Sequence, residues 1–420
     1  MLSIVKRITP QFVLRALRPV YHYLLALIGA LYYRFPGREL IVVGVTGTKG
    51  KSSTAEILGN IFDRAGYTTA VLGTIKFKIG NTTERNLKKM TMPGRFFVQK
   101  FLRDAVRAGC THAVIEMTSE GAKQYRERFI DMDALIFTNL SPEHIESHGS
   151  YEHYRAAKLA IARTLARSKK QKRFMVGNAD DKESALFFAV PDVIPIPFSL
   201  DQAKGLIADE KHIAFLWHDT AVTSDLGGRF NAFNILAAAT VARELGVPLP
   251  AIVDGIATTA KIDGRLERIE VGQTYPVIVD YAHTPDSLEA VYKTFTEYDT
   301  ICVLGNTGGG RDKWKRPVMG ALAERYCGEV ILTNEDPYDE DPTQILTEIA
   351  SGMKQKHPEI ILDRREAIMR ALLLAKEKKH PAVLITGKGT DPFIMGPNGT
   401  KEPWDDRSVA EEALHKVLAS

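Results

Sequence analysis

Gly47-Thr48-Lys49-Gly50-Lys51-Ser52-Ser53-Thr54 lies between an apolar run at 40–45, which predicts a buried strand, and residues 55–62, whose apolar side chains have helical spacing. A strand, a glycine-rich loop and a helix in that order build a cradle for phosphate. Glycine lets backbone N–H groups approach an anion, and the helix N-terminus adds partial positive charge. Lys51 would reach the terminal phosphates and Ser52 would bind Mg²⁺. The match to the general P-loop pattern is imperfect, because Val45 stands where that pattern has its first glycine. The alternative is a tight turn that carries a surface lysine.

Outward from this loop, short apolar strands alternate with helical patterns, at 69–73, 112–116, 134–139 and 172–176. This alternation predicts a largely parallel sheet covered by helices. The pattern restarts near 261–265 and continues at 275–280, 300–305, 329–333 and 382–387. We therefore predict an α/β protein with a central P-loop-type domain and a C-terminal Rossmann-like domain, preceded by an apolar helix. The predicted boundaries are 1–36, 37–262 and 263–420.

Length and composition fit this division. A chain of 420 residues exceeds what one core usually holds, so at least two domains are expected. A net charge of +4 is too thinly spread to indicate nucleic-acid binding. The three cysteines, Cys110, Cys302 and Cys327, have no framework or metal-binding spacing. They are expected to be core thiols of a cytoplasmic protein.

The N-terminal run at 20–33 is apolar and aromatic, with arginines on both sides. A secretory signal would need a cleavage site of small residues, and Tyr32-Tyr33-Arg34 is a poor one. The run is also shorter than the roughly 18–20 residues that span a bilayer. Tyrosines with flanking arginines suit a helix that lies in a membrane interface, here over 12–34. A helix packed on the catalytic domain or in a dimer explains the run equally well.

Polar residues follow several predicted strands. Glu116 ends one strand, opposite the phosphate loop, where phosphoryl-transfer enzymes hold Mg²⁺. The segment 138–149 follows another and contains two histidines and two carboxylates, which favours a metal or phosphate role. Lys158 lies in a predicted helix, and nothing in its local sequence distinguishes it. Two glycine-rich basic loops, at 305–317 and 387–391, would bind anions through backbone N–H groups and fixed cations.

Taken in order, these motifs resemble the Mur ligases, and within them the MurE type, over about residues 40–415. Further elements of the resemblance are Met90-Thr91-Met92-Pro93, Ser119 with Gln124 and Arg126, and Trp404-Asp405-Asp406-Arg407. The resemblance implies an ATP-dependent ligase of peptidoglycan synthesis, and hence of cell shape and division. It would phosphorylate the carboxylate of a muramoyl-peptide acceptor and join a free amino acid to it as the third residue of the stem peptide.

The resemblance also implies the roles of individual residues. The catalytic and metal set is Lys51, Ser52, Glu116, His144 and Lys158, the last as a carbamate that can bind Mg²⁺. ATP contacts are expected at Gly47, Thr48, Lys49, Gly50, Lys51, Ser52, Ser53, Asn139, Asn234, Arg265, Asp280 and His283. Acceptor contacts are expected at Thr91, Ser119, Gln124 and Arg126, and amino-acid contacts at Arg311, Glu335, Asp336, Gly387 and Asp391.

Two departures from the family pattern stand out. Family members usually carry an N-terminal domain for the uridine diphosphate end of the acceptor, whereas about 36 residues precede the first predicted strand here. We therefore expect either that the remaining domains hold the acceptor or that the acceptor is lipid-linked, with the enzyme at the inner membrane face.

The second departure lies in the amino-acid pocket. Diaminopimelate-adding members carry Asp-Asn-Pro-Arg, and this chain has Glu335-Asp336-Pro337-Tyr338. Loss of the arginine and gain of an acid favour an amino acid with a distal ammonium group, such as L-lysine. Alternatives to the MurE-type reading are a pseudomurein, folylpolyglutamate or cyanophycin ligase, and a nucleotide-binding partner without activity.

Overall fold

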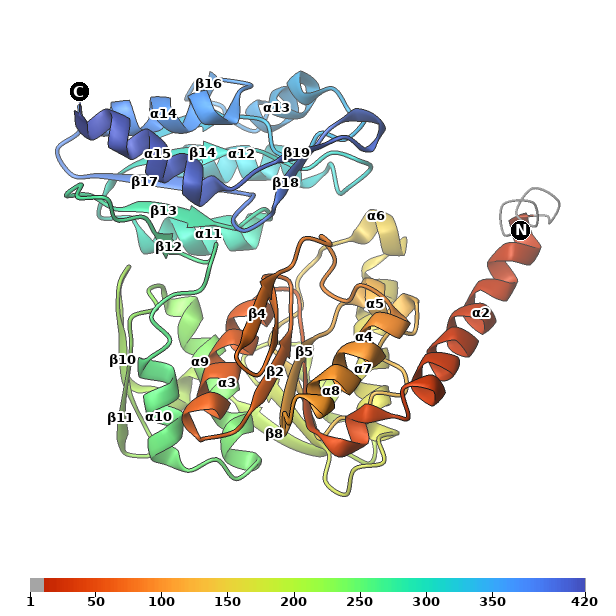
Figure 1. The fold of residues 1–420 in the computed structure, drawn as a ribbon. Coiled ribbons are helices and arrows are strands. Elements are labelled where there is room, and N and C mark those ends of the chain that lie inside the picture. The colour runs from red at the N-terminus through yellow and green to blue at the C-terminus, as the bar shows by residue number, and fades with distance from the viewer. Residues whose placement is uncertain (1–10, 420) are drawn as a thin grey trace. The chain divides into compact units, whose positions relative to one another are not determined.

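The computed structural model describes residues 11–419, and Figure 1 shows their elements. Two compact units are present, and each is described by itself. The first comprises the described residues up to Leu140 together with Glu152–Gln202 and Phe233–Ile256. The second comprises Ser141–Tyr151, Ala203–Ala232 and the chain from Ala257 onward. The domain boundary expected at 262–263 stays a prediction.

The first unit is built on one eight-stranded sheet in the order β4-β3-β2-β5-β1-β6-β7-β8. All of its strand pairs are parallel except those of β3 with β2 and with β4. The central strands are buried along their whole length, as expected where helices cover both faces. The strands are β1 Ile41–Thr46, β2 Thr69–Leu72, β3 Lys76–Ile79, β4 Thr82–Arg85, β5 His112–Glu116, β6 Ala134–Phe137, β7 Phe174–Asn178 and β8 Ile194–Phe198.

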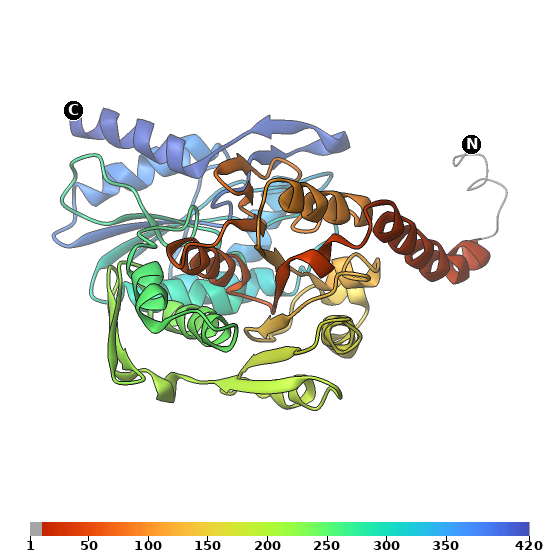
Figure 2. The same cartoon turned by 60° about the horizontal axis from the view of Figure 1, so that its bottom comes forward.

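Helices precede, connect and follow these strands along the chain. Figure 2 shows the first of them, α2, extending away from the rest of the first unit. The helices are α2 Gln11–Tyr32, η1 Pro36–Glu39, α3 Lys51–Arg64, α4 Arg95–Arg107, α5 Ser119–Lys123, α7 Tyr151–Ala166, α8 Ser184–Phe188, η2 Leu200–Gln202, α9 Arg229–Glu244 and α10 Leu249–Ala257. No helix among residues 11–419 is both long and apolar enough to cross a bilayer.

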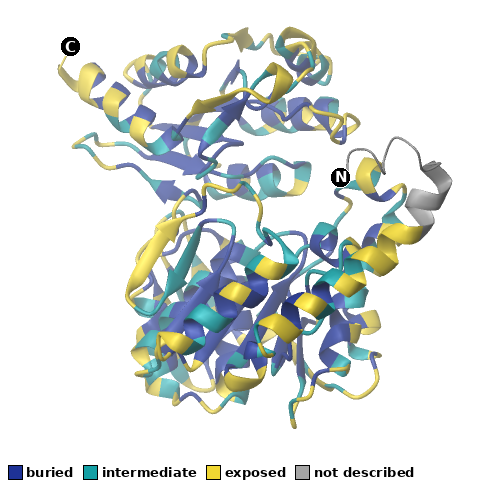
Figure 3. Cartoon of the chain, turned by 45° about the vertical axis from the view of Figure 1, so that its right-hand side comes forward, coloured by how far each residue is buried: buried dark blue, intermediate teal, exposed yellow. Residues whose placement is uncertain are grey.

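The second unit holds a six-stranded sheet, β12-β13-β17-β14-β15-β16, whose pairs are parallel apart from β12 with β13. Its core has two halves because side chains alternate across a strand. Ile301 and Val303 of β14 pack with α14 and α15, whereas Cys302 and Leu304 pack with α11, α12 and α13. Figure 3 shows these strands buried beneath more exposed helices.

The elements of the second unit are α6 Ile145–His148, β9 Lys204–Ala208, β10 Ile213–Trp217, β11 Thr220–Ser224, β12 Glu267–Arg268, β13 Val277–Asp280, α11 Pro285–Thr294, β14 Asp299–Leu304, α12 Lys315–Tyr326, β15 Glu329–Leu332, α13 Pro342–Ala350, β16 Glu359–Ile360, α14 Arg364–Ala375, β17 Pro381–Thr386, β18 Phe393–Met395, η3 Pro397–Gly399, β19 Lys401–Pro403 and α15 Asp406–Ala419. Strands β9, β10 and β11 form a separate antiparallel sheet, and β18 pairs with β19.

One expectation about the cysteines is wrong. Cys302 in β14 and Cys327 after α12 form a disulfide, so they are not free thiols. The spacing of 25 residues gave no sign of this, because the two meet only when α12 packs back on the strand. Cys110 is a buried free thiol, as expected.

Candidate active site

The glycine-rich loop joins β1 to α3, and two of its glycines have no substitute. Gly47 has φ of 144°, and a Cβ there would lie 1.9 Å from Thr138 Oγ1. Gly50 caps α3 with φ of 80°, and a Cβ there would lie 2.3 Å from Asn234 Oδ1. Both positions combine a left-handed backbone with close packing, which only glycine tolerates. Gly47 therefore supplies both the backbone conformation and the clearance that the loop needs at this position.

Asn139 holds the loop from the end of the neighbouring strand β6. Its Oδ1 accepts a hydrogen bond from Lys49 N at 2.9 Å, and its backbone oxygen accepts one from Thr48 N at 2.8 Å. Asn234 of α9 accepts a bond from Thr54 Oγ1 at 3.4 Å. The structure thus brings both predicted nucleotide-contacting asparagines to the loop.

Two lysines donate to the loop backbone. Lys51 Nζ donates to Gly47 O at 2.9 Å and to Thr48 O at 2.8 Å. Lys158 Nζ of α7 donates to Gly47 O at 2.6 Å, and its side chain is almost fully buried. Two ammonium groups beside a helix N-terminus produce a strongly positive site for an anion.

Glu116 lies at the end of β5, next to the first turn of α3. Its Oε2 accepts from Ser52 Oγ at 3.1 Å and from Thr74 Oγ1 at 2.9 Å, and its Oε1 accepts from Thr74 N at 2.7 Å. Thr74 Oγ1 also lies 2.8 Å from Thr91 Oγ1, a predicted acceptor contact. Sequence reasoning missed Thr74, although it closely follows β2 at the same carboxyl edge of the sheet as Glu116.

The Ser52 hydroxyl and the Glu116 carboxylate fit Mg²⁺. Among residues 11–419, no three His, Cys, Asp or Glu side chains are grouped so as to hold a metal. Mg²⁺ is commonly bound by one or two protein oxygens, with phosphates and water completing its shell, so the small protein set suits it. His144 belongs to the second unit, where it precedes α6 with φ of 57°. Its role as a metal ligand stays a prediction.

The predicted acceptor residues Gln124 and Arg126 lie beside a third polar residue, Arg95 of α4. Arg126 Nη2 donates to Gln124 Oε1 at 2.9 Å, and Arg95 Nε donates to Gln124 O at 2.7 Å. Ser119 begins α5 and is buried. Arg95 was not predicted, because only the fold brings α4 beside this segment.

In the second unit, three predicted nucleotide contacts surround Tyr281. Arg265 lies with its guanidinium 4.4 Å from the Tyr281 ring centroid, and His283 Nδ1 is 2.7 Å from Tyr281 O. Asp280 ends β13, where its Oδ2 accepts from Leu266 N at 2.6 Å. Partial burial raises the pKa of the Tyr281 hydroxyl, so Tyr281 remains a neutral platform between them.

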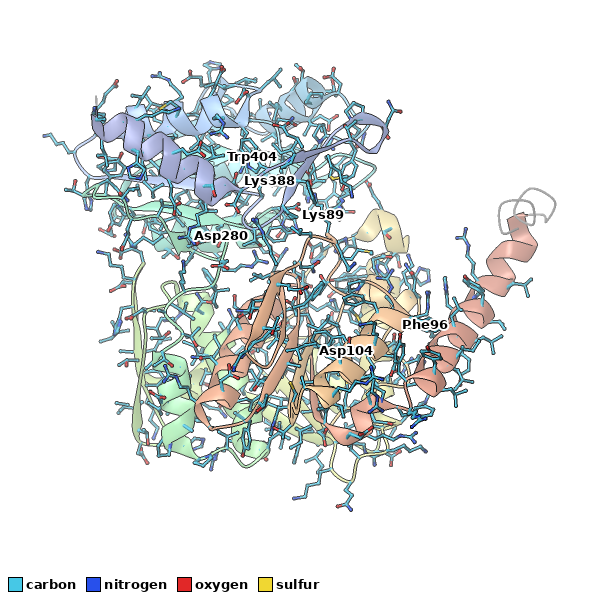
Figure 4. All side chains as sticks on the ribbon, in the orientation of Figure 1. Lys89, Phe96, Asp104, Asp280, Lys388 and Trp404 are labelled. Carbon is cyan, nitrogen blue, oxygen red and sulfur yellow. A yellow bond between two sulfur atoms is a disulfide. The ribbon has the colours of Figure 1, made fainter. Side chains whose placement is uncertain are left out.

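The predicted amino-acid contacts gather around a lysine that sequence reasoning left without a role. Lys388 is fully buried, and its Nζ donates to Asp336 Oδ1 at 2.8 Å and to Asp391 Oδ2 at 3.1 Å. Figure 4 labels it in the second unit. Glu335 is also buried, and burial raises the pKa of its carboxyl group. A Cβ on Gly387 would lie 2.7 Å from Glu335 Oε2, so this glycine makes room for the acid.

Tyr338, which replaces the family arginine, lies between Arg311 and a pocket. The Arg311 guanidinium is 5.9 Å from its ring centroid. The pocket has a volume of about 740 Å³ and lies between the 334–342 loop and the β18–β19 hairpin. Four carboxylates and one lysine line it: Asp339, Glu340, Asp341, Glu402 and Lys401. Glu340 is already paired with Lys313 and Arg316, at 3.0 and 3.1 Å. The other three carboxylates outnumber the single lysine, so the lining favours a cation.

Two family models match the chain. The Mur ligase middle domain matches residues 45–242, and the Mur ligase glutamate ligase domain matches residues 264–389. A UDP-N-acetylmuramoyl-L-alanyl-D-glutamate–2,6-diaminopimelate ligase from Bacillus cereus is 35% identical over 405 residues, which covers 93% of this chain and 81% of the relative. The chain belongs to the Mur ligase family. It is an ATP-dependent ligase that forms an amide bond, and the predicted α/β fold class is confirmed.

Other Mur ligases give a consistent comparison. A UDP-N-acetylmuramyl-tripeptide synthetase from Roseiflexus sp. is 36% identical, over 94% of this chain and 82% of the relative. A solved structure of a UDP-N-acetylmuramoyl-L-alanyl-D-glutamate–2,6-diaminopimelate ligase is 29% identical with a TM-score of 0.61. That match covers 91% of this chain and 79% of the solved one. These relatives are of the MurE type, as predicted.

Proposed function

We propose that this Mur ligase joins a diamino acid with a distal ammonium group, L-lysine foremost, to a muramoyl-peptide acceptor as the third residue of the peptidoglycan stem peptide. The single observation behind the choice of amino acid is Tyr338, which stands beside a pocket rich in carboxylates where the family pattern has an arginine. The relatives are named for 2,6-diaminopimelate, whose distal carboxylate would meet like charge in this pocket.

The reaction begins with phosphoryl transfer. The γ-phosphoryl group of ATP moves to an acceptor carboxylate oxygen, ADP leaves, and an acyl phosphate forms. Lys51 and the loop N–H groups neutralise and orient the phosphates, which supplies most of the catalysis in such transfers. Ser52 and Glu116 would hold Mg²⁺, which screens the charge of the phosphates. The hydrogen bonds of Asn139 and Asn234 would keep the loop in the conformation that binds the phosphates.

Amide formation completes the cycle. The α-amine of the amino acid attacks the acyl carbon, inorganic phosphate leaves, and the nitrogen loses a proton. Arg311 would pair with the α-carboxylate of the incoming amino acid. Lys388 holds Asp336 and Asp391 in place, so these acids keep a fixed position even though part of their charge is neutralised.

Lys158 has a second proposed role as a carbamate. The ammonium group would first lose a proton, and the neutral amine would then add CO₂ and release a second proton. The resulting carbamate anion could join Glu116 and Ser52 around Mg²⁺. Its burial against the phosphate loop supports this, because a bare ammonium there would repel the metal.

Product analysis by mass spectrometry tests the amino-acid choice. The enzyme, ATP and a muramoyl-dipeptide acceptor are incubated with L-lysine, L-ornithine or meso-diaminopimelate, and kcat/KM is measured for each. We expect L-lysine to be preferred over meso-diaminopimelate by about tenfold or more, as one charged hydrogen bond allows. Tyr338→Arg should shift the ratio toward meso-diaminopimelate by about 10- to 100-fold, and Tyr338→Phe should leave it unchanged. Preferred use of meso-diaminopimelate by the unaltered enzyme would overturn the proposal.

A further inference from the structure

Helix α2 has one face packed on the first unit. Ala26 and Ala30 are buried, and the backbone at Gly29 lies against Phe96 of α4. Phe96 is labelled beside this helix in Figure 4. Tyr23 adds ring contacts with Tyr125 and Phe129 at centroid distances of 6.1 and 5.3 Å. These contacts fix which side of α2 faces outward.

The outward side of α2 is apolar. Its exposed side chains recur at helical spacing, at intervals of three and four residues, and so form one stripe. Each is between 48% and 73% exposed. We call them the outer face: Leu17, Val20, Tyr21, Leu24, Ile28, Leu31 and Tyr32. Figure 3 shows the exposed positions along this helix.

The chain around α2 is strongly basic. Residues 1–38 contain six of the 55 lysines and arginines and none of the 51 acidic residues. The rest of the chain therefore carries 49 basic and 51 acidic residues, a small negative excess. Arg18 and Arg34, near the two ends of the outer face, are exposed. The net positive charge of the chain thus comes from the part of the sequence that contains α2.

We propose that α2 lies along an anionic lipid surface through its outer face. An apolar stripe with tyrosines and arginines at its margins matches the boundary between acyl chains and headgroups. A second copy of the chain is a poorer occupant, because it would bring two acid-free basic segments together. Since no described helix can cross a bilayer, α2 would lie in the plane of the interface.

The packed face of α2 reaches the predicted acceptor segment. Arg95 Nη2 donates to His22 Nδ1, and Arg95 Nε donates to Gln124 O at 2.7 Å. If the proposed acceptor role of Gln124 and Arg126 holds, a lipid-bound α2 keeps that edge of the first unit at the membrane surface. The lipid-binding proposal itself does not depend on that role.

Vesicle flotation of the full-length protein tests the proposal. The probes are vesicles of phosphatidylcholine alone and of phosphatidylcholine with about one-third phosphatidylglycerol, at low and high salt. We expect binding to the anionic vesicles, and a loss of at least threefold at 0.5 M salt, where the Debye length is roughly 4 Å. The double variant Leu24→Glu/Ile28→Glu should bind the anionic vesicles at least fivefold less than the parent. Ile207→Glu, which places one such charge at a 68% exposed apolar residue of β9, should bind like the parent, and the single variant Leu24→Glu gives the comparison at equal charge.

Several outcomes would overturn the proposal. They are absence of flotation with anionic vesicles, equal flotation of the parent and the α2 double variant, or a dimer that the double variant dissociates without any lipid binding. Both substituted side chains are about half exposed, so circular dichroism should confirm an unchanged fold. Amino-acid-dependent ATP hydrolysis without vesicles is measured in parallel, so failure of lipid binding stays distinct from failure of the proposed function.

Discussion

At the scale of single residues, Glu127 is the clearest case of a group whose charge the fold opposes. Its side chain is fully buried, and within the described residues its Oε2 has no hydrogen-bond partner. Burial raises the pKa of this carboxyl group from 4.5 to about 7. The nearby positive charge of Arg128 acts in the opposite direction but is the weaker effect. The folded state therefore keeps a proton between those pH values that the unfolded state releases. The free energy of unfolding falls as pH rises through this window, by at most about 3 kcal/mol.

Glu127→Gln should remove this dependence, because a neutral amide of the same shape does not titrate and carries no cost of charge burial. Urea denaturation of the parent and the variant at several pH values from 4.5 to 8 measures it. We expect the free energy of unfolding of the variant to increase relative to that of the parent as pH rises. His112, whose pKa burial lowers to about 4, is present in both proteins and cancels in the difference. A difference that stays constant with pH would contradict the interpretation.

The residue scale also shows where sequence reasoning ends. Gly47, Gly50 and Lys51 were predictable because they are neighbours in one loop whose chemistry is local. Lys158 was not distinguishable by its local sequence, since its burial arises only when α7 packs its lysine on Gly47. Lys388 lies in a predicted anion-binding loop, but its structural role was not predictable, because Asp336, one of its two carboxylate partners, comes from a loop 52 residues away in the sequence.

At the scale of elements, the start of α15 is tied to α14 by a buried charge pair. Arg364 donates to both carboxylate oxygens of Asp406, at 2.8 and 2.7 Å, and Trp404 Nε1 donates to Asp406 Oδ1 at 2.8 Å. Asp406→Ala should therefore destabilise the second unit by about 3–5 kcal/mol, because it leaves a buried guanidinium uncompensated. Glu412→Ala removes an exposed ion pair with Arg365 on the same helix and should cost less than about 1 kcal/mol. Urea denaturation compares them, and equal losses would contradict a special role for the buried pair.

Elements also differ in how well the sequence predicts them. The apolar runs at 40–45, 112–116 and 382–387 became β1, β5 and β17 with shifts of at most one residue, because strands buried on both faces carry a continuous apolar signal. Strands such as β4, β8 and β19 were not predicted. They lie at sheet edges or in a hairpin, with mostly exposed residues, and so lack that signal.

At the scale of the whole molecule, family membership makes ATP a ligand that the native chain binds and the unfolded chain does not. A non-hydrolysable ATP analogue with Mg²⁺, at about 100 times its Kd, should then stabilise the protein by about 2.7 kcal/mol. For units of this size that corresponds to roughly 5–10 °C in Tm.

Lys51→Ala should lose most of this shift, because Lys51 Nζ lies on the loop that would receive the phosphates. Lys182→Ala, at an exposed position after β7, should keep it. Omitting Mg²⁺ should reduce the shift in the parent, since Ser52 and Glu116 then lack the ion that joins them to the phosphates. An unchanged shift in the Lys51 variant would mean that the nucleotide binds elsewhere, and the loop would lose its role as the phosphate site, on which the proposed roles of Ser52 and Glu116 depend.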